Sequence, residues 1–307
     1  MSKKFKQQDE DQKCAPSKKY NEGSCFTLEA LIRMTVAYNV KCHKTKQGTA
    51  IDIRENKKYL IGKLTKALEN VCSDQICWLE QDFIKELNDA EINNDTFRPR
   101  ITQGRFDWLN TTNIKEVMDQ YHKVHNDFKF MGALPMDFDD IPQYGVRNMN
   151  FDDLKIQGIN RLGFIFNLDE SWQRGSHWVS MFADLTDNRI YYFDSYGTKP
   201  KKRVRDLVNR IATWCYSRNY KGTKTAMSES AISDSFMNKT KKNKIEKVFQ
   251  SIDYNNVRHQ FKHSECGVYS INFILRLLKG EDFDRICNNI TSDDEINECR
   301  PIYFRFK

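Results

Sequence analysis

Four polar residues in the second half of the chain have the types and spacing that nucleophilic catalysis by a cysteine requires. His177 stands directly before an apolar, strand-like run, and Asp194 directly follows another. Gln260 lies six residues before Cys266, which opens a strongly apolar segment. A carboxylate beside an imidazole fixes its tautomer and stabilises the imidazolium that forms during such catalysis. His177 and Asp194 therefore form the first candidate pair.

Cys266 is placed where a thiol becomes reactive. The run Cys-Gly-Val-Tyr-Ser-Ile-Asn-Phe-Ile-Leu predicts a buried helix that begins near Cys266. The positive end of a helix dipole favours the thiolate, and a neighbouring imidazolium favours it further. The backbone N–H of Cys266 and the side-chain amide of Gln260 are candidate donors to a tetrahedral oxyanion. Gly267 is expected to leave room for a substrate backbone.

Each of these features also has an ordinary structural interpretation. A lone His-Trp pair is usually packing, Asp-Ser after a strand is usually a turn, and a thiol that opens an apolar helix is usually buried. A metal site at His259, His263 and Cys266 is a further alternative, but it would need a fourth ligand. Zinc binding by Cys72 and Cys77 would likewise need partners that their neighbourhood lacks. The ordered set of four polar residues favours catalysis.

The elements that would position these residues can be predicted from hydropathy. Strands are expected at 162–168, 178–183 and 189–193, with residues 184–188 joining the last two as a hairpin. A hairpin brings the start of one strand beside the end of the next, so His177 and Asp194 are expected to be neighbours. Strands followed by helices indicate an α+β fold. The remaining predicted elements are a helix at 204–216, an inserted mobile loop at 222–244, a short strand at 257–261 and a helix at 267–278.

The first third of the chain has a different pattern. Three stripes of apolar residues at helical spacing predict a helical accessory domain over residues 26–97, followed by a polar, Pro-containing linker. Residues 1–25 are rich in Lys, Gln, Asp and Ser and predict a flexible segment. Residues 98–307 are assigned to the catalytic domain.

Composition excludes several classes of protein. The 307 residues are 39% hydrophobic and 30% charged, which is typical of a soluble globular protein. We find no run of about 18 apolar residues and no secretory signal, so we predict no membrane contact and no secretion. The nine cysteines are an odd number without a CxxC pair. We therefore predict a reducing compartment, with most cysteines as buried thiols rather than disulfides.

Positive charge is concentrated in one segment. Residues Lys199–Lys262 contain 16 basic and 5 acidic residues, or +11, against +7 for the whole chain, so the remainder is about −4. Such a segment predicts salt-sensitive binding of DNA or of an acidic partner. The alternative is that these charges only keep a loop solvated.

Several segments resemble one enzyme family. Gly-Ser-His-Trp, Tyr-Tyr-Phe-Asp-Ser-Tyr-Gly and Gln-Phe-Lys-His-Ser-Glu-Cys-Gly are similar to the motifs of the Ulp1/adenain clan of papain-like cysteine proteases. The segment Asp107-Trp108-Leu109-Asn110 resembles the Trp-Leu-Asn motif of Ulp1 enzymes. The resemblance covers about residues 100–280. It implies a papain-like core with a central mixed sheet flanked by helices, to which the apolar stripes add the small N-terminal helical domain.

The resemblance also implies roles for the four residues. Cys266 matches the nucleophile, His177 the general base and acid, Asp194 the group that orients His177, and Gln260 the oxyanion donor. Trp108, Asn110 and Trp178 are the candidate substrate-binding residues, with the two indoles as walls of a narrow tunnel. Glu265 departs from the pattern, because cellular members carry Asp at this position.

Taken together, these features predict a cysteine endopeptidase that needs no cofactor and no metal. The resemblance implies a polypeptide substrate cleaved after Gly-Gly or Gly-X-Gly. The N-terminal helical region and the segment 128–138 make the chain most similar to the polyprotein-processing proteases of nucleocytoplasmic large DNA viruses. The expected role is processing of viral structural polyproteins during virion maturation, in the virion or the host cytoplasm. The alternatives are a deconjugase of SUMO or ubiquitin-like proteins, an acetyltransferase-type effector, and a nucleic-acid-binding module.

Overall fold

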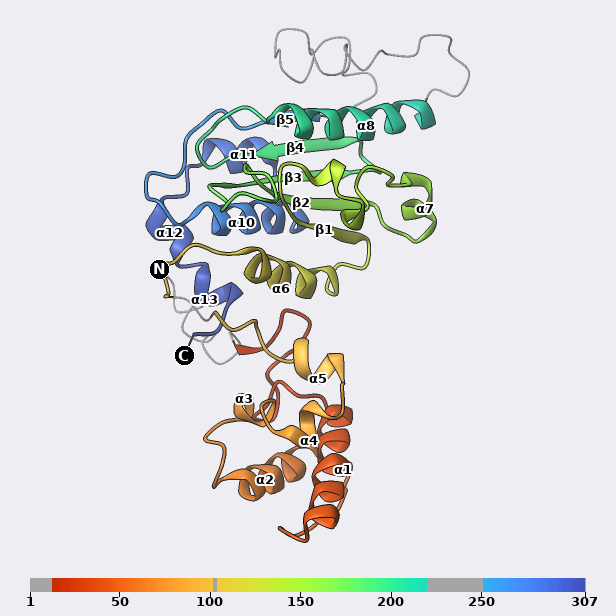
Figure 1. Cartoon of the computed structure of the whole chain (residues 1–307), viewed down its shortest axis with the longest axis vertical. Helices are drawn as coiled ribbons and strands as arrows, with labels where there is room; N and C mark the ends of the chain where they lie inside the picture. The colour runs from red at the N-terminus through yellow and green to blue at the C-terminus, as the bar shows by residue number, and fades with distance from the viewer. Residues whose placement is uncertain (1–12, 102–103, 220–250, 307) are drawn as a thin grey trace. The chain divides into compact units, whose positions relative to one another are not determined.

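A computed structural model describes residues 13–101, 104–219 and 251–306. The chain divides into two compact units (Figure 1). The first unit contains residues 1–102 and 301–307, and the second contains residues 103–300. The loop predicted at 222–244 and residues 1–12 lie outside the described residues.

The first unit is helical, as the apolar stripes predict. Its two longest helices are α1 (Leu28–Thr45) and α2 (Lys57–Leu68), whose N-caps are Thr27 and Asn56. Each cap side chain accepts a backbone N–H of the first turn, which satisfies a donor that the helix leaves unpaired. The stripes of both helices meet in one apolar core. Three short helices complete the unit: α3 (Gln75–Trp78), α4 (Asp82–Lys85) and α5 (Ala90–Asn94).

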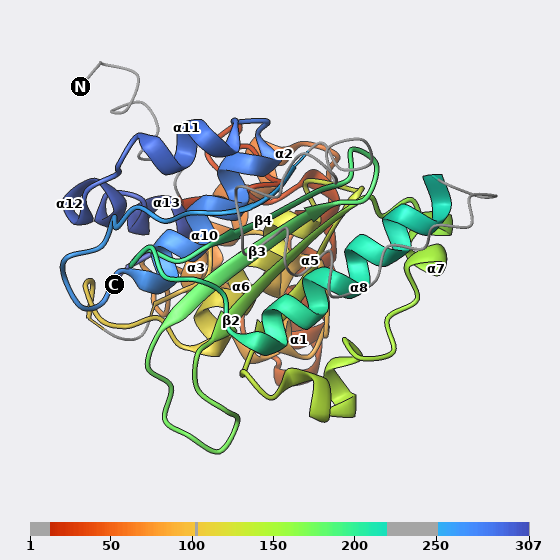
Figure 2. The same ribbon diagram turned by 90° about the horizontal axis from the view of Figure 1, so that it is seen from above.

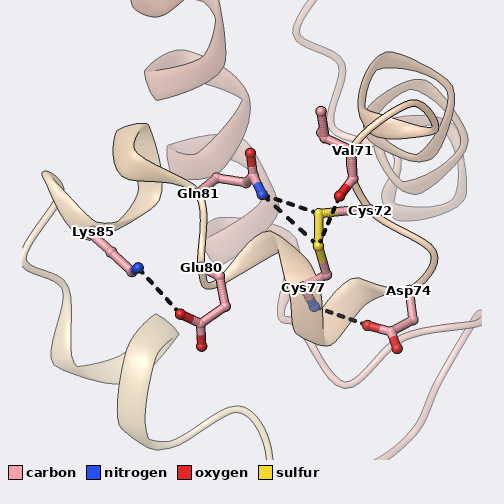
Figure 3. Close-up of a disulfide and its surroundings, with 7 residues drawn as sticks. All are labelled: Val71, Cys72, Asp74, Cys77, Glu80, Gln81 and Lys85. Atoms are coloured by element: carbon pink, nitrogen blue, oxygen red, sulfur yellow. Dashed lines mark hydrogen bonds and ion pairs between the residues drawn. A yellow bond between two sulfur atoms is a disulfide. The ribbon is translucent and has the colours of Figure 1, made fainter.

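Four cysteines of the first unit form disulfides, so the expectation of mostly free thiols is wrong for this region. Cys14 is bonded to Cys25, and Cys72 to Cys77 (Figure 3). The second pair closes the turn between α2 and α3, where Gln81 donates to the sulfur of Cys72 at 3.2 Å. Cys72 and Cys77 are thus bonded to each other rather than arranged as zinc ligands. The other five cysteines are free thiols.

Both ends of the first unit differ from the predicted boundaries. Cys14, Ala15 and Cys25 are buried, so parts of the predicted N-terminal segment pack in the first unit. Residues 301–307 group with the first unit because they pair with the segment that follows α5. The backbone N–H of Arg305 donates to the Pro99 carbonyl at 2.9 Å, and the Arg305 carbonyl accepts the backbone N–H of Ile101.

The second unit is built on a five-stranded mixed sheet in the order β1-β2-β3-β4-β5. β2 and β3 run antiparallel, as do β3 and β4, whereas β1 and β5 pair in parallel with their neighbours. The predicted strand at 257–261 is wrong; the strand lies earlier, and residues 257–261 continue as irregular backbone. The strands are β1 (Phe128–Leu134), β2 (Arg161–Asn167), β3 (Trp178–Asp184), β4 (Arg189–Phe193) and β5 (Ser251–Tyr254).

Helices cover both faces of this sheet, which gives the α+β core that the resemblance implies. Figure 2 shows α8 (Lys202–Asn219) and α10 (Cys266–Leu278) on opposite faces. The apolar stripe of α8 packs on Phe164, Phe166 and Met181. No helix in the described part of the chain is long and apolar enough to span a bilayer. The other helices are α6 (Thr111–His122), α7 (Phe151–Ile156), α11 (Phe283–Asn288), α12 (Asp293–Asn297) and α13 (Arg300–Tyr303), with short 3-10 turns at Phe138–Asp140 and Pro142–Tyr144.

Candidate active site

The hairpin of β3 and β4 brings His177 and Asp194 together. Its register pairs Ser180 with Phe193, so the residue before β3 lies beside the residues that follow β4. Nε2 of His177 is 2.7 Å from Oδ1 of Asp194, and both side chains are buried. The ring of Tyr196 stacks on the imidazole at 4.3 Å between centroids. These contacts fix the plane of the imidazole and hold its Nε2 toward Asp194.

The Asp194 carboxylate has further donors that hold it in place. Its side chain is 0% exposed and accepts hydrogen bonds from the Tyr196 backbone N–H and the Thr198 hydroxyl. Asn255, after β5, accepts the Asp194 backbone N–H and donates to the Asp194 carbonyl. Buried charge is tolerated where hydrogen bonds replace its hydration. Asn255 is a positioning residue that the sequence patterns did not indicate.

His177 also faces Cys266, the first residue of α10. Burial alone lowers the pKa of His177, but hydrogen bonds to Asp194 and to the Cys266 thiol outweigh it and raise this pKa to about 9. The imidazolium is therefore the favoured form at neutral pH, and it is the partner that a thiolate needs. The three side chains come from β3, from the end of β4 and from the start of α10, and they form one constellation.

Gln260 is fixed in the loop that precedes Cys266. Its Oε1 accepts the Ser195 hydroxyl at 2.7 Å, and its Nε2 donates to the Lys262 carbonyl at 2.9 Å. The Ser195 carbonyl in turn accepts the backbone N–H groups of His259 and Gln260. A primary amide has two N–H donors, so one remains for an oxyanion. The residue after Asp194 thus holds the orientation of the predicted oxyanion donor.

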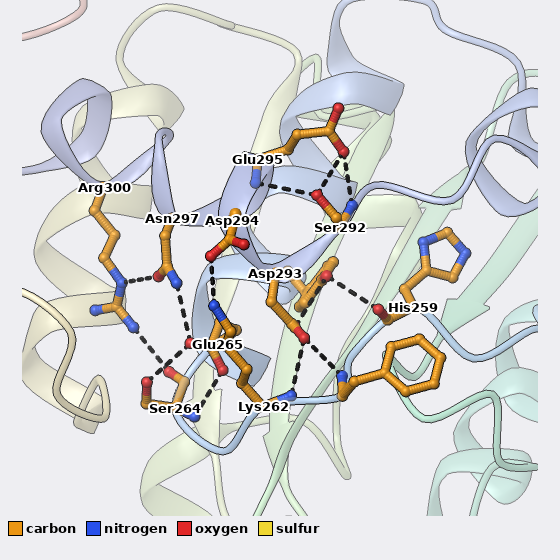
Figure 4. A network of polar contacts seen from close by, with 12 residues as sticks. His259, Lys262, Ser264, Glu265, Ser292, Asp293, Asp294, Glu295, Asn297 and Arg300 are labelled. Atoms are coloured by element: carbon orange, nitrogen blue, oxygen red, sulfur yellow. Dashed lines mark hydrogen bonds and ion pairs between the residues drawn. The ribbon is translucent and has the colours of Figure 1, made fainter.

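Two buried side chains of the C-terminal region clamp the same loop (Figure 4). Asp293, the first residue of α12, accepts the backbone N–H groups of Phe261 at 2.8 Å and Lys262 at 2.9 Å. Arg300 is 0% exposed and donates to the carbonyls of Ser264 and Asp107. It therefore joins the loop before the nucleophile to the segment that carries Trp108. Neither residue belongs to a motif that sequence reasoning singled out.

Glu265 fits this network despite departing from the family pattern. Its carboxylate accepts the Ser264 backbone N–H at 2.8 Å and the Asn297 amide at 3.0 Å. The Oδ1 atom of Asn297 also accepts a hydrogen bond from Nε of Arg300 at 2.7 Å. Asn297 of α12 and the Ser264 backbone thus hold the longer side chain in place.

The three predicted substrate-binding residues line one cavity of about 360 Å³. Trp108 is 45% exposed, whereas Trp178 is buried and donates its indole N–H to the Leu109 carbonyl at 2.8 Å. Asn110 caps α6 through Asn113 and so shapes the cavity mainly by fixing this helix. Residues after β2 that the sequence patterns did not indicate complete the wall: Asp169, Glu170, Ser171, Gln173 and Arg174.

Gly267 has a packing role besides the one expected. A Cβ at this position would lie 3.0 Å from the Leu109 Cβ, which is tighter than most side-chain contacts. The glycine therefore lets Leu109 pack against α10, and its approach to a substrate backbone stays a prediction. His259 is buried and its Nε2 contacts the Cys287 carbonyl. The described residues contain no group of three or more His, Cys, Asp or Glu side chains arranged to hold a metal ion.

Asp194→Asn is expected to be milder than Asp194→Ala. An asparagine keeps an oxygen for His177, and its amide would face Thr198, whose hydroxyl accepts as well as donates. Alanine removes the orienting group and leaves both neighbours unpaired. Steady-state kinetics of the two variants measures the difference, with circular dichroism as the control for folding. If Asp194→Asn were as inactive as a variant without the nucleophile, Asp194 would have another role.

The His177 pKa predicts an alkaline limit to activity. The pKa lies above its ordinary value of 6.5, so the imidazolium persists until the pH rises through about 9. The same shift stabilises the folded chain below pH 6.5, and this contribution is lost as the pH rises through about 9. We expect kcat/KM to fall above this pH, and to fall at lower pH in Asp194→Asn. An identical alkaline limb in both enzymes would contradict this origin.

A pre-oriented imidazole beside a thiol at a helix N-terminus, next to a cavity lined by two indoles and several polar side chains, is the arrangement of a cysteine protease. The profile of the Ulp1 protease family, C-terminal catalytic domain, matches residues 160–300. A protein of Acanthamoeba polyphaga mimivirus named as a thiol protease is 35% identical over 308 residues, covering 95% of this chain and 93% of that protein.

Proteins of African swine fever virus are also similar. A SUMO-1 cysteine protease of this virus is 26% identical over 148 residues, which are 48% of this chain and 44% of that protein. The crystal structure of an African swine fever virus protease matches with a TM-score of 0.60 and 19% identity, over 96% of each chain. This likeness establishes the fold. The chain belongs to the Ulp1 protease family and is a cysteine protease.

Proposed function

We propose that the protein is an endopeptidase that cleaves after Gly-Gly or Gly-X-Gly and processes viral structural polyproteins during virion maturation. The Cys266 thiolate attacks the scissile carbonyl, and His177 protonates the leaving amine. Water activated by His177 then hydrolyses the thioester. Gln260 and the Cys266 backbone N–H stabilise the oxyanion.

The observation that carries this proposal is the cavity between Trp108 and Trp178. Two indoles line the cavity, and Trp178 is fixed by its hydrogen bond to Leu109. Trp178 directly follows His177, so the cavity lies beside the catalytic pair. A buried aromatic wall held by a hydrogen bond, as Trp178 is, disfavours a bulky side chain beside it and leaves room for a segment without side chains. Glycines before the scissile bond have this property.

A panel of peptides tests the specificity. We would compare Gly-Gly, Gly-Ala-Gly, Ala-Ala and Val-Val before the same scissile bond, with wild type and Cys266→Ala. Cleavage of the two glycine-containing peptides alone, and only by wild type, would support the proposal. Equal cleavage of Val-Val would contradict it. Trp108→Ala, which opens one wall, is expected to relax the preference for glycine.

A deconjugase for a SUMO-type or ubiquitin-like protein is the second candidate. One observation favours it: a viral protein that this chain resembles is named as a SUMO-1 cysteine protease. Incubation with a SUMO precursor and, separately, with a virion core polyprotein distinguishes the two. Efficient Cys266-dependent cleavage of the SUMO precursor alone would replace polyprotein processing as the function.

We also propose that DNA or an acidic partner binds the basic segment Lys199–Lys262. The structure does not describe residues 220–250 of this segment. Among the residues that it does describe, many basic side chains already have acidic partners. If five lysines contact phosphates, log K should fall with log salt at a slope of roughly −4 to −5. Fluorescence anisotropy with duplex DNA at several salt concentrations measures this slope. The ion pairs are Lys202–Asp206, Arg203–Asp140, Arg210–Asp139, Arg218–Asp152 and Lys262–Asp294.

The site of action follows from the proposed role, and we place it in the virion or the host cytoplasm. The two disulfides bear on this proposal, because cytosolic thiols reduce most protein disulfides. Thiol counting on protein from purified virions, before and after reduction, would show whether Cys14, Cys25, Cys72 and Cys77 are bonded in that environment.

A further inference from the structure

A second group of side chains lies beside the catalytic residues, on the other half of the sheet. The cavity is lined from the ends of β1 and β2 and the start of β3. Tyr196 follows β4, and Arg258 and Phe261 follow β5. The strand directions place all these positions at one edge of the sheet. Because His177 precedes the central strand β3, it stands between the cavity and the second group.

Arg258 is held in this group by two rings and one hydrogen bond. Its guanidinium lies over Tyr196 at 5.1 Å from the centroid and over Phe261 at 4.9 Å. Its Nε donates to the Gln260 carbonyl at 2.7 Å. Tyr196 stacks on His177 with its rings 8° from parallel. The guanidinium is therefore connected to the catalytic imidazole through a single aromatic ring.

The group is arranged to receive a ligand rather than to stabilise the core. Phe261 is 66% exposed, so its ring buries little of its own surface. Stacking uses the faces of the guanidinium and leaves its terminal N–H groups at the edge. Within the described residues, no carboxylate pairs with Arg258. A planar, pre-oriented guanidinium with free donors matches a carboxylate, which it can bind in a bidentate manner.

We propose that Arg258, supported by Tyr196 and Phe261, is a specificity subsite for an acidic residue on the carboxyl-terminal side of the scissile bond. This inference rests on the proposed function, which assigns the cavity to the residues before that bond. An extended polypeptide that occupies the cavity and crosses Cys266 continues over Tyr196 toward Arg258. A carboxylate in the first or second residue after the bond then meets the guanidinium.

Matched peptides test this subsite. Each peptide carries Gly-Gly before the bond and Glu, Gln or Lys at the first or second position after it; a second set varies the residue before the glycines. The readout is the ratio of kcat/KM for Glu over Lys in one enzyme, because general losses of folding or turnover cancel in this ratio. For wild type we expect a ratio of about fivefold to tenfold in favour of Glu.

Three variants separate local pairing from other effects. Arg258→Glu is expected to reverse the ratio, and Arg258→Lys to reduce it without reversal, because lysine lacks the planar fork. Lys279→Glu is the charge-matched control. Lys279 is exposed and follows the last residue of α10, about 20 Å from Cys266 by the rise of a 13-residue helix. The Glu-to-Lys ratio of this variant should equal that of wild type.

The outcomes distinguish this inference from the function on which it rests. Cleavage without a charge preference, a preference confined to residues before the bond, or an equal change in Arg258→Glu and Lys279→Glu would overturn the subsite alone. Absence of any Cys266-dependent cleavage across the panel would overturn the proposed function and the subsite together. A reversal specific to Arg258→Glu establishes the subsite.

Discussion

Cys266→Ala and His177→Ala are each expected to abolish peptide hydrolysis while the fold survives. Removing a nucleophile or its base typically lowers the rate by on the order of 10³-fold or more. Here the thiol begins α10, and its imidazole partner is fixed by Asp194 and Tyr196. Each change removes a group on which every chemical step depends.

The fold should tolerate both changes for local reasons. Cys266→Ala removes one sulfur atom. His177→Ala leaves Asp194 with the Tyr196 N–H and the Thr198 hydroxyl as donors, so the buried carboxylate is not left unpaired. Burst and steady-state assays with purified proteins measure the loss, and Cys215→Ala, a buried thiol away from the site, is the matched control. Peptidase activity retained by either catalytic variant would refute the mechanism.

What the sequence could reveal was largely local. The β3–β4 hairpin was predictable because its two strands are short apolar runs joined by four residues, and the hairpin geometry alone brings His177 to Asp194. The apolar run that follows Cys266 was sufficient to place a helix N-terminus at this residue. The register of β3 and β4 then places the residue before β3 beside the residue after β4.

What the sequence could not reveal depends on contacts between distant segments. β1 carries Lys129 and Gly132 within its length, so its hydropathy does not alternate as a half-buried strand does. β5 has only four residues, too few for a period to show. Asn255 holds Asp194 across 61 positions, and Arg300 reaches Asp107 across 193. A polar residue at either position looks like any surface residue until the fold brings its partner near.

The disulfides were missed for a related reason. Cys14 and Cys25 are 11 positions apart, and Cys72 and Cys77 are five, spacings that carry no recognised pattern. Pairing depends on the distance between Cα atoms, which is 5.3 Å and 5.4 Å in the two bonds. The odd number of cysteines and the lack of a CxxC pair predicted thiols, whereas local geometry permits the bonds.

Gln260→Ala is expected to lower kcat by about 10²–10³-fold and to change KM much less, because an oxyanion donor acts mainly in the transition state. The amide already has its orientation before substrate binds. Ser195 donates to its oxygen, and Lys262 accepts one of its N–H groups. The donor therefore needs no reorganisation during the reaction, which is the condition under which such a group contributes most.

Gln260 is buried, so Gln260→Ala has a second effect that can lower kcat. It leaves the Ser195 hydroxyl and the Lys262 carbonyl without hydrogen-bond partners, and each unpaired buried group lowers stability by about 1–3 kcal/mol. Gln260→Glu narrows the second cause to the Lys262 carbonyl. A glutamate keeps the volume and the acceptor for Ser195, but it has no N–H to donate to that carbonyl or to an oxyanion, and its charge opposes an oxyanion. Ser195→Ala is the converse control, because it keeps the donor and removes only one contact that orients it.

We expect Gln260→Glu to lose as much kcat as Gln260→Ala and Ser195→Ala to lose far less, with thermal denaturation reporting the folded state of each. A defect confined to KM would instead make Gln260 a substrate-binding residue, and a full loss in Ser195→Ala would show that the loop, rather than the donor, limits the reaction.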